Sequence, residues 1–183
     1  MPSETSKAAI RRVHECFFFR YLFGDGIDIG YGGDPVCDWC KTWDKVDGDA
    51  TLMSGLEPRS FDWVYSSHCL EHLEDPTAAL ARWWELLKPQ GRLLIVVPDE
   101  DLYEQGVWPS RWNPDHKTTW TICKKQSWSP VSRNLATELG NLPGGQIKYL
   151  KLLDSIYNYT VKDVDQSQGL GEVGIEAVVI KNG

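Results

Sequence analysis

Asp28-Ile29-Gly30-Tyr31-Gly32-Gly33 is the stretch of sequence that decides the fold. Its first residues end the short apolar segment Ile27-Asp28-Ile29, which predicts a buried strand, and Asp34-Pro35 follows it. Three glycines directly after a first strand form a tight turn whose backbone a ligand can approach closely. The stretch therefore predicts an α/β protein with a ligand at the carboxyl end of its first strand.

The charge beside this turn indicates which ligand it suits. A dinucleotide fingerprint, G-x-G-x-x-G, would need a third glycine where Pro35 stands. The carboxylate of Asp28 would repel a pyrophosphate, whereas it would suit a ligand that carries an ammonium and a sulfonium. An NAD-dependent oxidoreductase is therefore the disfavoured alternative, which a binding test with both cofactors decides.

A helix is predicted over residues 7–22, before the first strand. Ile10, Val13, Phe17 and Tyr21 recur at spacings of three and four residues, which places them on one apolar face. The neighbouring Phe18 and Phe19 either cover the sheet or form a homodimer surface, and both alternatives stay open.

Helices and strands alternate along the rest of the chain. Strands are predicted at 61–65, 92–97, 146–153 and 175–181, and helices start at Asp75-Pro76 and at Ser129-Pro130, the second running to Gly140. Trp43-Asp44 and Gly48-Asp49-Ala50 are candidates for the tips of short strands. This order predicts one domain over residues 1–183, with a doubly wound, mainly parallel sheet and antiparallel C-terminal strands.

Two segments depart from a regular alternation of strands and helices. Only 26 residues separate Pro35 from Asp62, so the second and third strands must be abbreviated. Residues 98–128 show little periodicity and are predicted to form a long functional loop, a lid that binds a substrate. The tryptophans of this segment form either an aromatic wall around the substrate or the loop's own core.

Composition excludes several classes of function. The formal net charge is −7 and no Lys/Arg block is present, which argues against nucleic acid and favours a small molecule as partner. No apolar run approaches the roughly 20 residues that span a bilayer, so an intracellular, cytoplasmic protein with free thiols is expected. Cys37 and Cys40 supply only two ligands, fewer than a structural zinc needs, so no metal is predicted.

The sequence from about residue 24 to residue 100 resembles the class I, Rossmann-like methyltransferases that use S-adenosylmethionine (SAM), in their small-molecule, type 11-like branch. The glycine stretch 28–33 is similar to motif I of that family. Residues 61–72 are similar to its fourth-strand motif, and 87–93 to its turn into the fifth strand, with Gln90 where glycine is common. The order and spacing of the last two segments make this resemblance specific.

The resemblance implies SAM as cofactor, S-adenosylhomocysteine as product, and a set of binding residues. Asp44 stands where the family has the acid that holds the ribose hydroxyls, with Asp38 and Asp47 as rivals, and Asp49-Ala50 resembles the pair beside the adenine. The predicted cofactor-binding residues are Asp28, Ile29, Gly30, Tyr31, Gly32, Asp44, Asp49, Ala50, Ser67 and His68.

Methyl transfer from a sulfonium requires alignment of the acceptor and often a base that takes the acceptor's proton. His68, at the end of the fourth-strand motif, and His116, in the 98–128 segment, are the candidate catalytic bases. The alternative is that both histidines only support the backbone around them. The Asp/Asn-Pro-Pro-aromatic run of amino-methylating relatives is absent, so a small-molecule or carbohydrate-like acceptor is expected. A non-catalytic SAM-binding partner or regulatory module is the alternative function.

Overall fold

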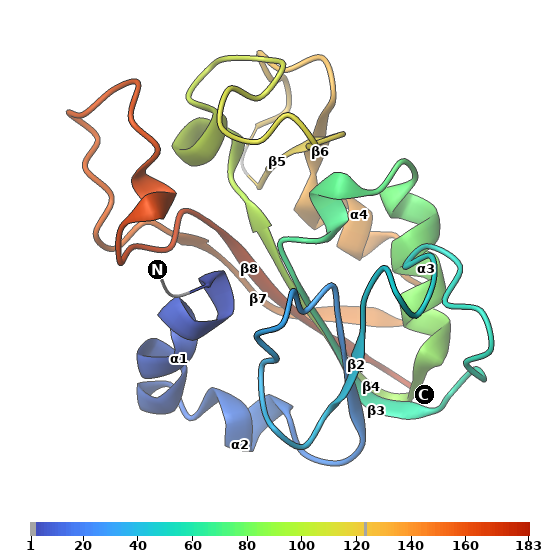
Figure 1. The fold of residues 1–183 in the computed structure, drawn as a ribbon. Coiled ribbons are helices and arrows are strands. Elements are labelled where there is room, and N and C mark those ends of the chain that lie inside the picture. Colours follow the sequence, from blue (N-terminus) through green and yellow to red (C-terminus); the bar gives the residue numbers. More distant parts are fainter. Residues whose placement is uncertain (1–2, 123) are drawn as a thin grey trace.

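The computed structural model describes residues 3–122 and 124–183, and its centre is a six-stranded sheet in the order β2-β1-β3-β4-β8-β7 (Figure 1). The strands are β1 (Gly26–Ile29), β2 (Lys41–Trp43), β3 (Phe61–Ser67), β4 (Leu87–Pro98), β7 (Gly145–Leu153) and β8 (Gly174–Lys181). β1 to β4 pair in parallel, and β8 lies antiparallel between β4 and β7. The predicted fold class and the two antiparallel late strands are confirmed.

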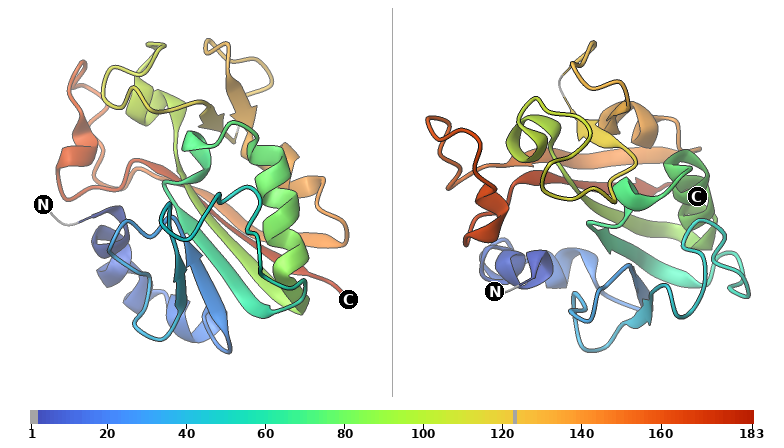
Figure 2. Two further views of the ribbon diagram at one scale, coloured as in Figure 1. Left: turned by 45° about the vertical axis from the view of Figure 1, so that its right-hand side comes forward. Right: turned by 45° about the horizontal axis from the view of Figure 1, so that its top comes forward.

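Helices cover both faces of the sheet (Figure 2). α1 (Glu4–His14) and α2 (Phe17–Tyr21) lie on one face, and α3 (Pro76–Leu86) and α4 (Leu135–Gly140) lie on the other. β4 serves both faces, because Ile95 and Val97 pack in the core under α3 while Leu94 and Val96 pack in the core under α2. No helix within 3–122 and 124–183 is long and apolar enough to span a bilayer.

The predicted helix over residues 7–22 is wrong in its extent and in its buried face. Two helices replace it, because Cys16 takes a left-handed backbone conformation with φ 54° and breaks the chain between them. Ile10 and Val13 are 75% and 64% exposed, whereas Arg12 is 1% exposed. Phe17 does lie in the core, as predicted.

Of the neighbours Phe18 and Phe19, only Phe18 covers the sheet, and the predicted homodimer surface stays a prediction. Phe18 packs against the core under α2, and Phe19 is 87% exposed.

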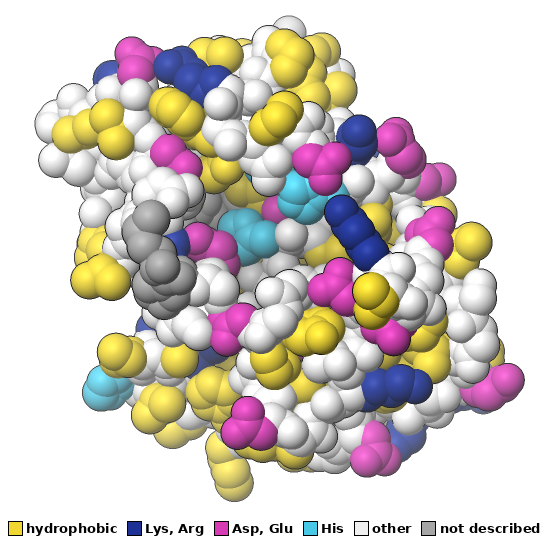
Figure 3. All heavy atoms as spheres, in the orientation of Figure 1, with side chains coloured by type: hydrophobic (Ala, Val, Ile, Leu, Met, Phe, Trp, Pro, Cys, Tyr) yellow, Lys and Arg dark blue, Asp and Glu magenta, His cyan; other side chains and the backbone are white. Residues whose placement is uncertain are grey.

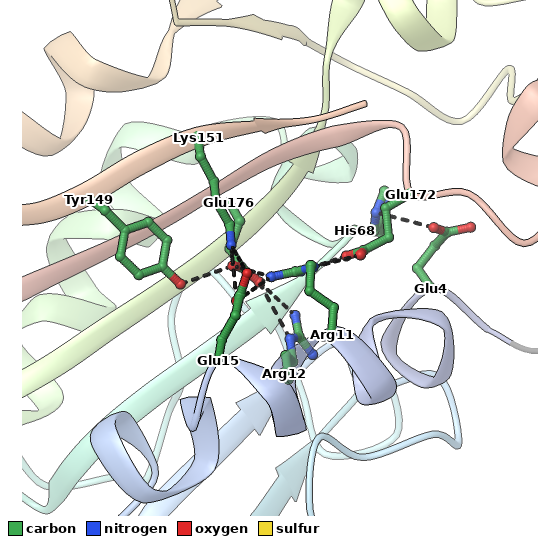
Figure 4. Close-up of polar contacts among 9 residues, drawn as sticks. All are labelled: Glu4, Arg11, Arg12, Glu15, His68, Tyr149, Lys151, Glu172 and Glu176. Atoms are coloured by element: carbon green, nitrogen blue, oxygen red, sulfur yellow. Dashed lines mark hydrogen bonds and ion pairs between the residues drawn. The ribbon is translucent and has the colours of Figure 1, made fainter. Parts of the chain in front are cut away.

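A buried ion-pair network explains why α1 turns its arginines to the sheet (Figure 4). The guanidinium of Arg12 lies 3.1 Å from Glu176 Oε2 on β8, and both side chains are 1% exposed. Arg11 pairs with the other oxygen of Glu176 at 2.9 Å, and the Tyr149 hydroxyl donates to the same oxygen at 2.9 Å. A buried carboxylate needs such partners. The network therefore turns the arginine face of α1 toward the sheet, whereas the apolar periodicity of the sequence predicted that the apolar face would be buried.

The predicted helix start at Ser129-Pro130 is also wrong. Residues Ser132–Asn134 form strand β6, which pairs in parallel with β5 (Thr119–Thr121), and α4 begins only at Leu135. Ser132 Oγ donates to the buried Glu100 carboxylate at 2.6 Å, which holds this segment extended. Asn134 then caps α4, accepting from Thr137 N at 3.1 Å.

The third helix agrees with its sequence signals. Asp75 Oδ1 accepts from Ala78 N at 2.9 Å, and Pro76 occupies the first helical position.

The segment between β2 and β3, residues 44–60, contains turns and no strand, so Gly48–Ala50 is not a strand tip. The sheet therefore ends at the three-residue β2: one of the two strands predicted between Pro35 and Asp62 is short, and the other is replaced by turns.

The 98–128 segment, whose description lacks residue 123, is folded rather than extended. It contains the short π-helical segment η2 (Glu100–Glu104), β5 and several turns. Trp120 on β5 is fully buried in the core under α3. Glu100 accepts hydrogen bonds from Thr119 Oγ1 at 3.0 Å and from Ser127 Oγ at 2.6 Å. These contacts tie the whole segment to the carboxyl end of β4.

Candidate active site

A pocket of about 570 Å³ lies beyond the carboxyl ends of β1, β2 and β3. This is the point where the chain order reverses between β1 and β3, which is where open α/β sheets bind ligands. The volume falls within the range of about 300–1,000 Å³ that small-molecule sites have. Figure 3 shows histidine and acidic side chains around a hollow in the middle of this face.

The glycine turn forms one wall of this pocket. Gly30 has φ +74° and donates its N–H to Trp43 O at 2.8 Å, which joins the turn to the end of β2. A Cβ atom at this position would lie 2.5 Å from the Cβ of Cys69. Gly32 lines the pocket, and its N–H donates to Asp44 Oδ2 at 3.0 Å. Glycine at residue 30 is therefore a steric requirement of the site.

The acid that follows β2 is the one on the pocket wall. Asp44 lines the pocket, directly after the strand ends at Trp43. Its rival Asp47 instead accepts a hydrogen bond from the backbone N of Asp44 at 2.9 Å. The other rival, Asp38, is exposed in the loop before β2. The placement favours Asp44 over Asp38 and Asp47 as the residue that faces a bound ligand.

The far wall combines an apolar surface with a second acid. Asp49 and Ala50 both line the pocket, and Asp49 Oδ1 also accepts from Thr51 N at 2.7 Å. Trp43 is 6% exposed and donates its Nε1–H to Gly48 O at 3.2 Å, so its ring is held in place. Such a wall fits a flat aromatic base beside a hydroxyl-bearing sugar.

Four predicted cofactor residues lie near the pocket without being among the side chains that line it. Ile29 is fully buried in the core, and Tyr31 lies in the turn itself. Ser67, at the end of β3, is 8% exposed. Asp28 is 1% exposed and accepts from Val36 N at 2.7 Å beneath the turn.

The protonation of Asp28 is unusual. Burial raises its pKa to about 7, although the hydrogen bond from Val36 and the charge of Arg12 oppose that rise. Its Oδ1 atom has no hydrogen-bond partner among the described residues. The contact with Val36 shapes the loop that follows the glycine turn.

His68 lies between this pocket and a second, inner pocket of about 180 Å³, and it lines both. It adopts φ +52°, and its N–H donates to Val96 O at 2.9 Å. Its Nδ1 atom lies 3.4 Å from Glu71 Oε1, and its Nε2 atom 4.0 Å from Glu4 Oε2. Burial lowers the pKa of His68, but the Glu71 carboxylate outweighs burial and the net pKa is raised.

The inner pocket is polar and is built from four separate parts of the chain. Its lining residues are Glu4, His68, Glu71, His72, Tyr103, Asn113, His116 and Ser167. They come from α1, from the loop and short helix η1 (Leu70–His72) after β3, from the 98–128 segment and from the helix η3 (Gln166–Gln168). The 98–128 segment thus contributes three side chains to this pocket.

His116 is held rigidly at the edge of the inner pocket. Its Nδ1 atom lies 2.7 Å from Glu104 Oε1, and the two side chains are 3% and 2% exposed. Its ring also packs against the ring of His72, with 4.9 Å between the centroids. The structure therefore brings the two predicted candidate bases, His68 and His116, to the same pocket.

Several site residues were missed by sequence reasoning. The first pocket is also lined by Trp43, Lys45, Cys69, His72, Leu73 and Asp115. The position of Lys45 and Cys69, each directly after a predicted site residue, was an available signal. His72 and Asp115 had none, because they are 43 residues apart in the chain and meet only in the folded protein, where His72 Nδ1 lies 3.3 Å from Asp115 O.

The Cys37/Cys40 pair behaves as two thiols. Cys40 Sγ donates to Cys37 O at 3.1 Å, and burial raises the pKa of Cys40 to about 12. Both residues are free cysteines, and neither lines the two pockets described above.

Comparison with known proteins assigns the chain to a family. Residues 2–137 match a family profile described as a methyltransferase domain. The chain therefore belongs to the methyltransferase-domain family. Within it, the fold is that of the class I, type 11-like methyltransferases, and the cofactor is SAM. The pocket fits this cofactor, because a glycine turn, an acid after β2 and an apolar wall meet there.

Individual relatives are distant. A 55-residue segment, 30% of this chain, is 34% identical to phosphoethanolamine N-methyltransferase 2 of Caenorhabditis elegans, and the match spans 13% of that protein. A SAM-dependent methyltransferase from Archaeoglobus fulgidus shares the fold with a TM-score of 0.54 and 15% identity over 94% of each chain. A chain from the complex of the Haloferax volcanii Trm112 methyltransferase activator with a methyltransferase gives 0.56 and 14% over 100% of both chains. These identities establish the fold alone.

Proposed function

We propose that this protein transfers a methyl group from SAM to a polar small-molecule acceptor that binds in the inner pocket. The observation that carries the proposal is the position of His68, which lines both the 570 Å³ pocket and the 180 Å³ pocket. A cofactor in the first pocket and an acceptor in the second would meet at this side chain. The polar lining of the inner pocket suits an acceptor that bears hydroxyl or amine groups, sugar-like compounds included.

Each wall of the site has a role in this proposal. Asp44 binds the ribose hydroxyl groups of the cofactor, Asp49 and Ala50 lie beside its adenine, and Gly30 and Gly32 allow its close approach to the backbone. When bound, SAM supplies a methyl group that its positively charged sulfur has already activated. The protein therefore has to align the acceptor and remove its proton.

Two histidines were predicted as bases, and their surroundings differ. His68 has side-chain access to both pockets, while His116 already engages Glu104 through Nδ1 at 2.7 Å. We assign the base to His68, whose position beside the cofactor pocket meets the geometric requirement for proton removal. His116 then binds or orients the acceptor from the opposite side.

Calorimetric titration with S-adenosylhomocysteine tests the cofactor site. We expect saturable binding, and Asp44→Asn should weaken it about 10–150-fold. This factor corresponds to the loss of about 1.5–3 kcal/mol, the contribution of a hydrogen bond to a charged group. Asp38→Asn, at the exposed rival acid, is the matched control and should bind like the wild type. Absence of binding by the wild type would refute the assignment of the pocket.

Turnover is measured next, by the release of S-adenosylhomocysteine with a panel of hydroxyl- and amine-bearing acceptors. His68→Gln should lower kcat by about 10²–10⁴-fold, the usual contribution of a general base, and this loss should exceed any loss of cofactor affinity, since His68 also lines the cofactor pocket. Cofactor binding without turnover on any acceptor would support the alternative, a SAM-binding partner or regulatory module. Full turnover by His68→Gln would exclude His68 as the base.

A further inference from the structure

Three potential metal ligands converge beside the inner pocket. Glu71 and His72 come from η1, and His116 comes from the 98–128 segment. Each offers one ligand atom, and these atoms all lie within 4.8 Å of one another. Ligands at about 2.1 Å from one tetrahedral ion are about 3.4 Å apart, so small side-chain movements would close the site around an ion.

The environment of the Glu71 carboxylate indicates that this cluster binds a cation. Its side chain is 0% exposed, and within the described residues neither of its carboxylate oxygens accepts a hydrogen bond. The nearest nitrogen atoms are His68 Nδ1 at 3.4 Å and His72 Nε2 at 3.9 Å. A buried carboxylate without hydrogen bonds is costly, and a cation beside it would remove that cost.

Both histidines are oriented as metal ligands usually are. His116 Nδ1 lies 2.7 Å from Glu104 Oε1, which leaves its Nε2 free. His72 Nδ1 lies 3.3 Å from Asp115 O, and its Nε2 faces Glu71. Metal-bound histidines characteristically donate their second nitrogen to a carboxylate or a carbonyl, which fixes the tautomer and the ring orientation.

We propose that Glu71, His72 and His116 bind one divalent transition-metal ion. Two imidazoles and one carboxylate suit zinc, manganese, iron or cobalt rather than calcium. Three protein ligands leave coordination positions open, and the 180 Å³ pocket provides space for them. This proposal departs from the sequence-based expectation, which was that the protein holds no metal.

The role of the ion rests on the proposed function: if the protein methylates an acceptor, the ion can bind and orient that acceptor. An open coordination position would hold a hydroxyl or carboxylate oxygen of the acceptor. It would thereby orient the acceptor between the metal and His68, which lies 3.4 Å from Glu71 and also lines the cofactor pocket. The acceptor class is therefore an oxygen-bearing small molecule that chelates through one or two oxygens.

Cobalt titration of the full chain tests the site. The protein is treated with a chelator, dialysed and titrated with Co²⁺ by calorimetry and visible absorption. We expect one ion per chain, with affinity reduced by more than about 100-fold in Glu71→Gln and in His72→Gln, because each variant removes a direct ligand. His14→Gln, at an exposed histidine of α1, is the matched control and should bind like the wild type.

The outcomes separate the metal site from the methyltransferase proposal. Circular dichroism and thermal unfolding of the same samples show whether each variant is folded, and His72→Gln serves if Glu71→Gln is not. No Co²⁺ binding by the wild type, or wild-type affinity in both Glu71→Gln and His72→Gln, overturns the site. Binding that only Cys40→Ser abolishes also overturns it, because the ion would then sit on the Cys37/Cys40 thiols. Metal binding without any methyl turnover contradicts the proposed function and leaves the metal site standing.

Discussion

Glu104 Oε1 lies 2.7 Å from His116 Nδ1, and both side chains are almost completely buried. This carboxylate–imidazole pair fixes the ring of His116, which offers one ligand atom within 4.8 Å of those of Glu71 and His72. The second oxygen of Glu104 has no hydrogen-bond partner among the described residues, so orientation of His116 is its evident role.

Glu104→Gln should weaken Co²⁺ binding by about 10–100-fold, the usual effect of altering a group that supports a metal ligand. The amide keeps the shape of the side chain but removes the charge that polarises His116. Calorimetry measures the change, and Glu57→Gln, at an exposed acid, is the control. An unaltered affinity in Glu104→Gln would show that this pair is only structural.

Glu176→Gln should lower the free energy of unfolding at pH 7 by about 3–5 kcal/mol, because it leaves the buried Arg12 guanidinium without its partner. Urea unfolding measures the loss. Glu15→Gln removes a half-exposed member of the same network and should cost at most about 1 kcal/mol. Equal losses in the two variants would contradict the central place of Glu176.

The same network predicts a pH dependence. Burial would raise the pKa of Glu176, but Arg11 and Arg12 reverse that effect and lower its pKa from 4.5 to about 2. A depressed folded-state pKa means that the stabilisation is complete above pH 4.5 and is lost as pH falls toward 2. The difference in stability between the wild type and Glu176→Gln should shrink over this interval. A constant difference from pH 7 to pH 2 would refute the assignment.

Gly30→Ala should abolish measurable binding of S-adenosylhomocysteine, since the added Cβ would lie 2.5 Å from Cys69 Cβ. Gly33→Ala is the matched control, because it has a similar φ of +85° and no heavy atom within 4 Å of the new Cβ. It carries only the backbone strain of about 1–2 kcal/mol. Cys69→Gly in the Gly30→Ala background should restore part of the affinity, and failure to do so would refute the steric explanation.

Asp28→Asn should retain affinity for S-adenosylhomocysteine within about threefold, whereas Asp28→Ala should lose about tenfold or more. The amide oxygen can still accept from Val36 N, while alanine leaves that buried N–H unpaired at a cost of about 1–3 kcal/mol. Calorimetry distinguishes the two. Equal losses in both variants would mean that the charge of Asp28 acts on the ligand directly, as its place beside the turn first suggested.

Local sequence signals predicted the elements that depend on neighbouring residues. Asp75-Pro76 starts α3, the alternating apolar residues of β4 face both cores, and the glycine turn follows β1. Each of these depends on capping, side-chain volume or backbone freedom within a few positions. Predictions failed where a distant residue competed with the local signal. Arg12 is buried because it pairs with Glu176, which is 164 residues away in the chain. Ser132 stays extended because its hydroxyl donates to Glu100.

The sequence by itself determined the class of fold, the glycine turn after the first strand and the family to which the chain belongs. These properties depend on contiguous motifs and on the order of strands and helices along the chain. Only the tertiary structure decided which polar groups share the inner pocket, because Glu4, Glu71, His116 and Ser167 come from four distant segments. Their proximity depends on how the 98–128 segment and α1 pack onto the sheet, and long-range packing and buried charge pairing leave no periodic signal in the chain.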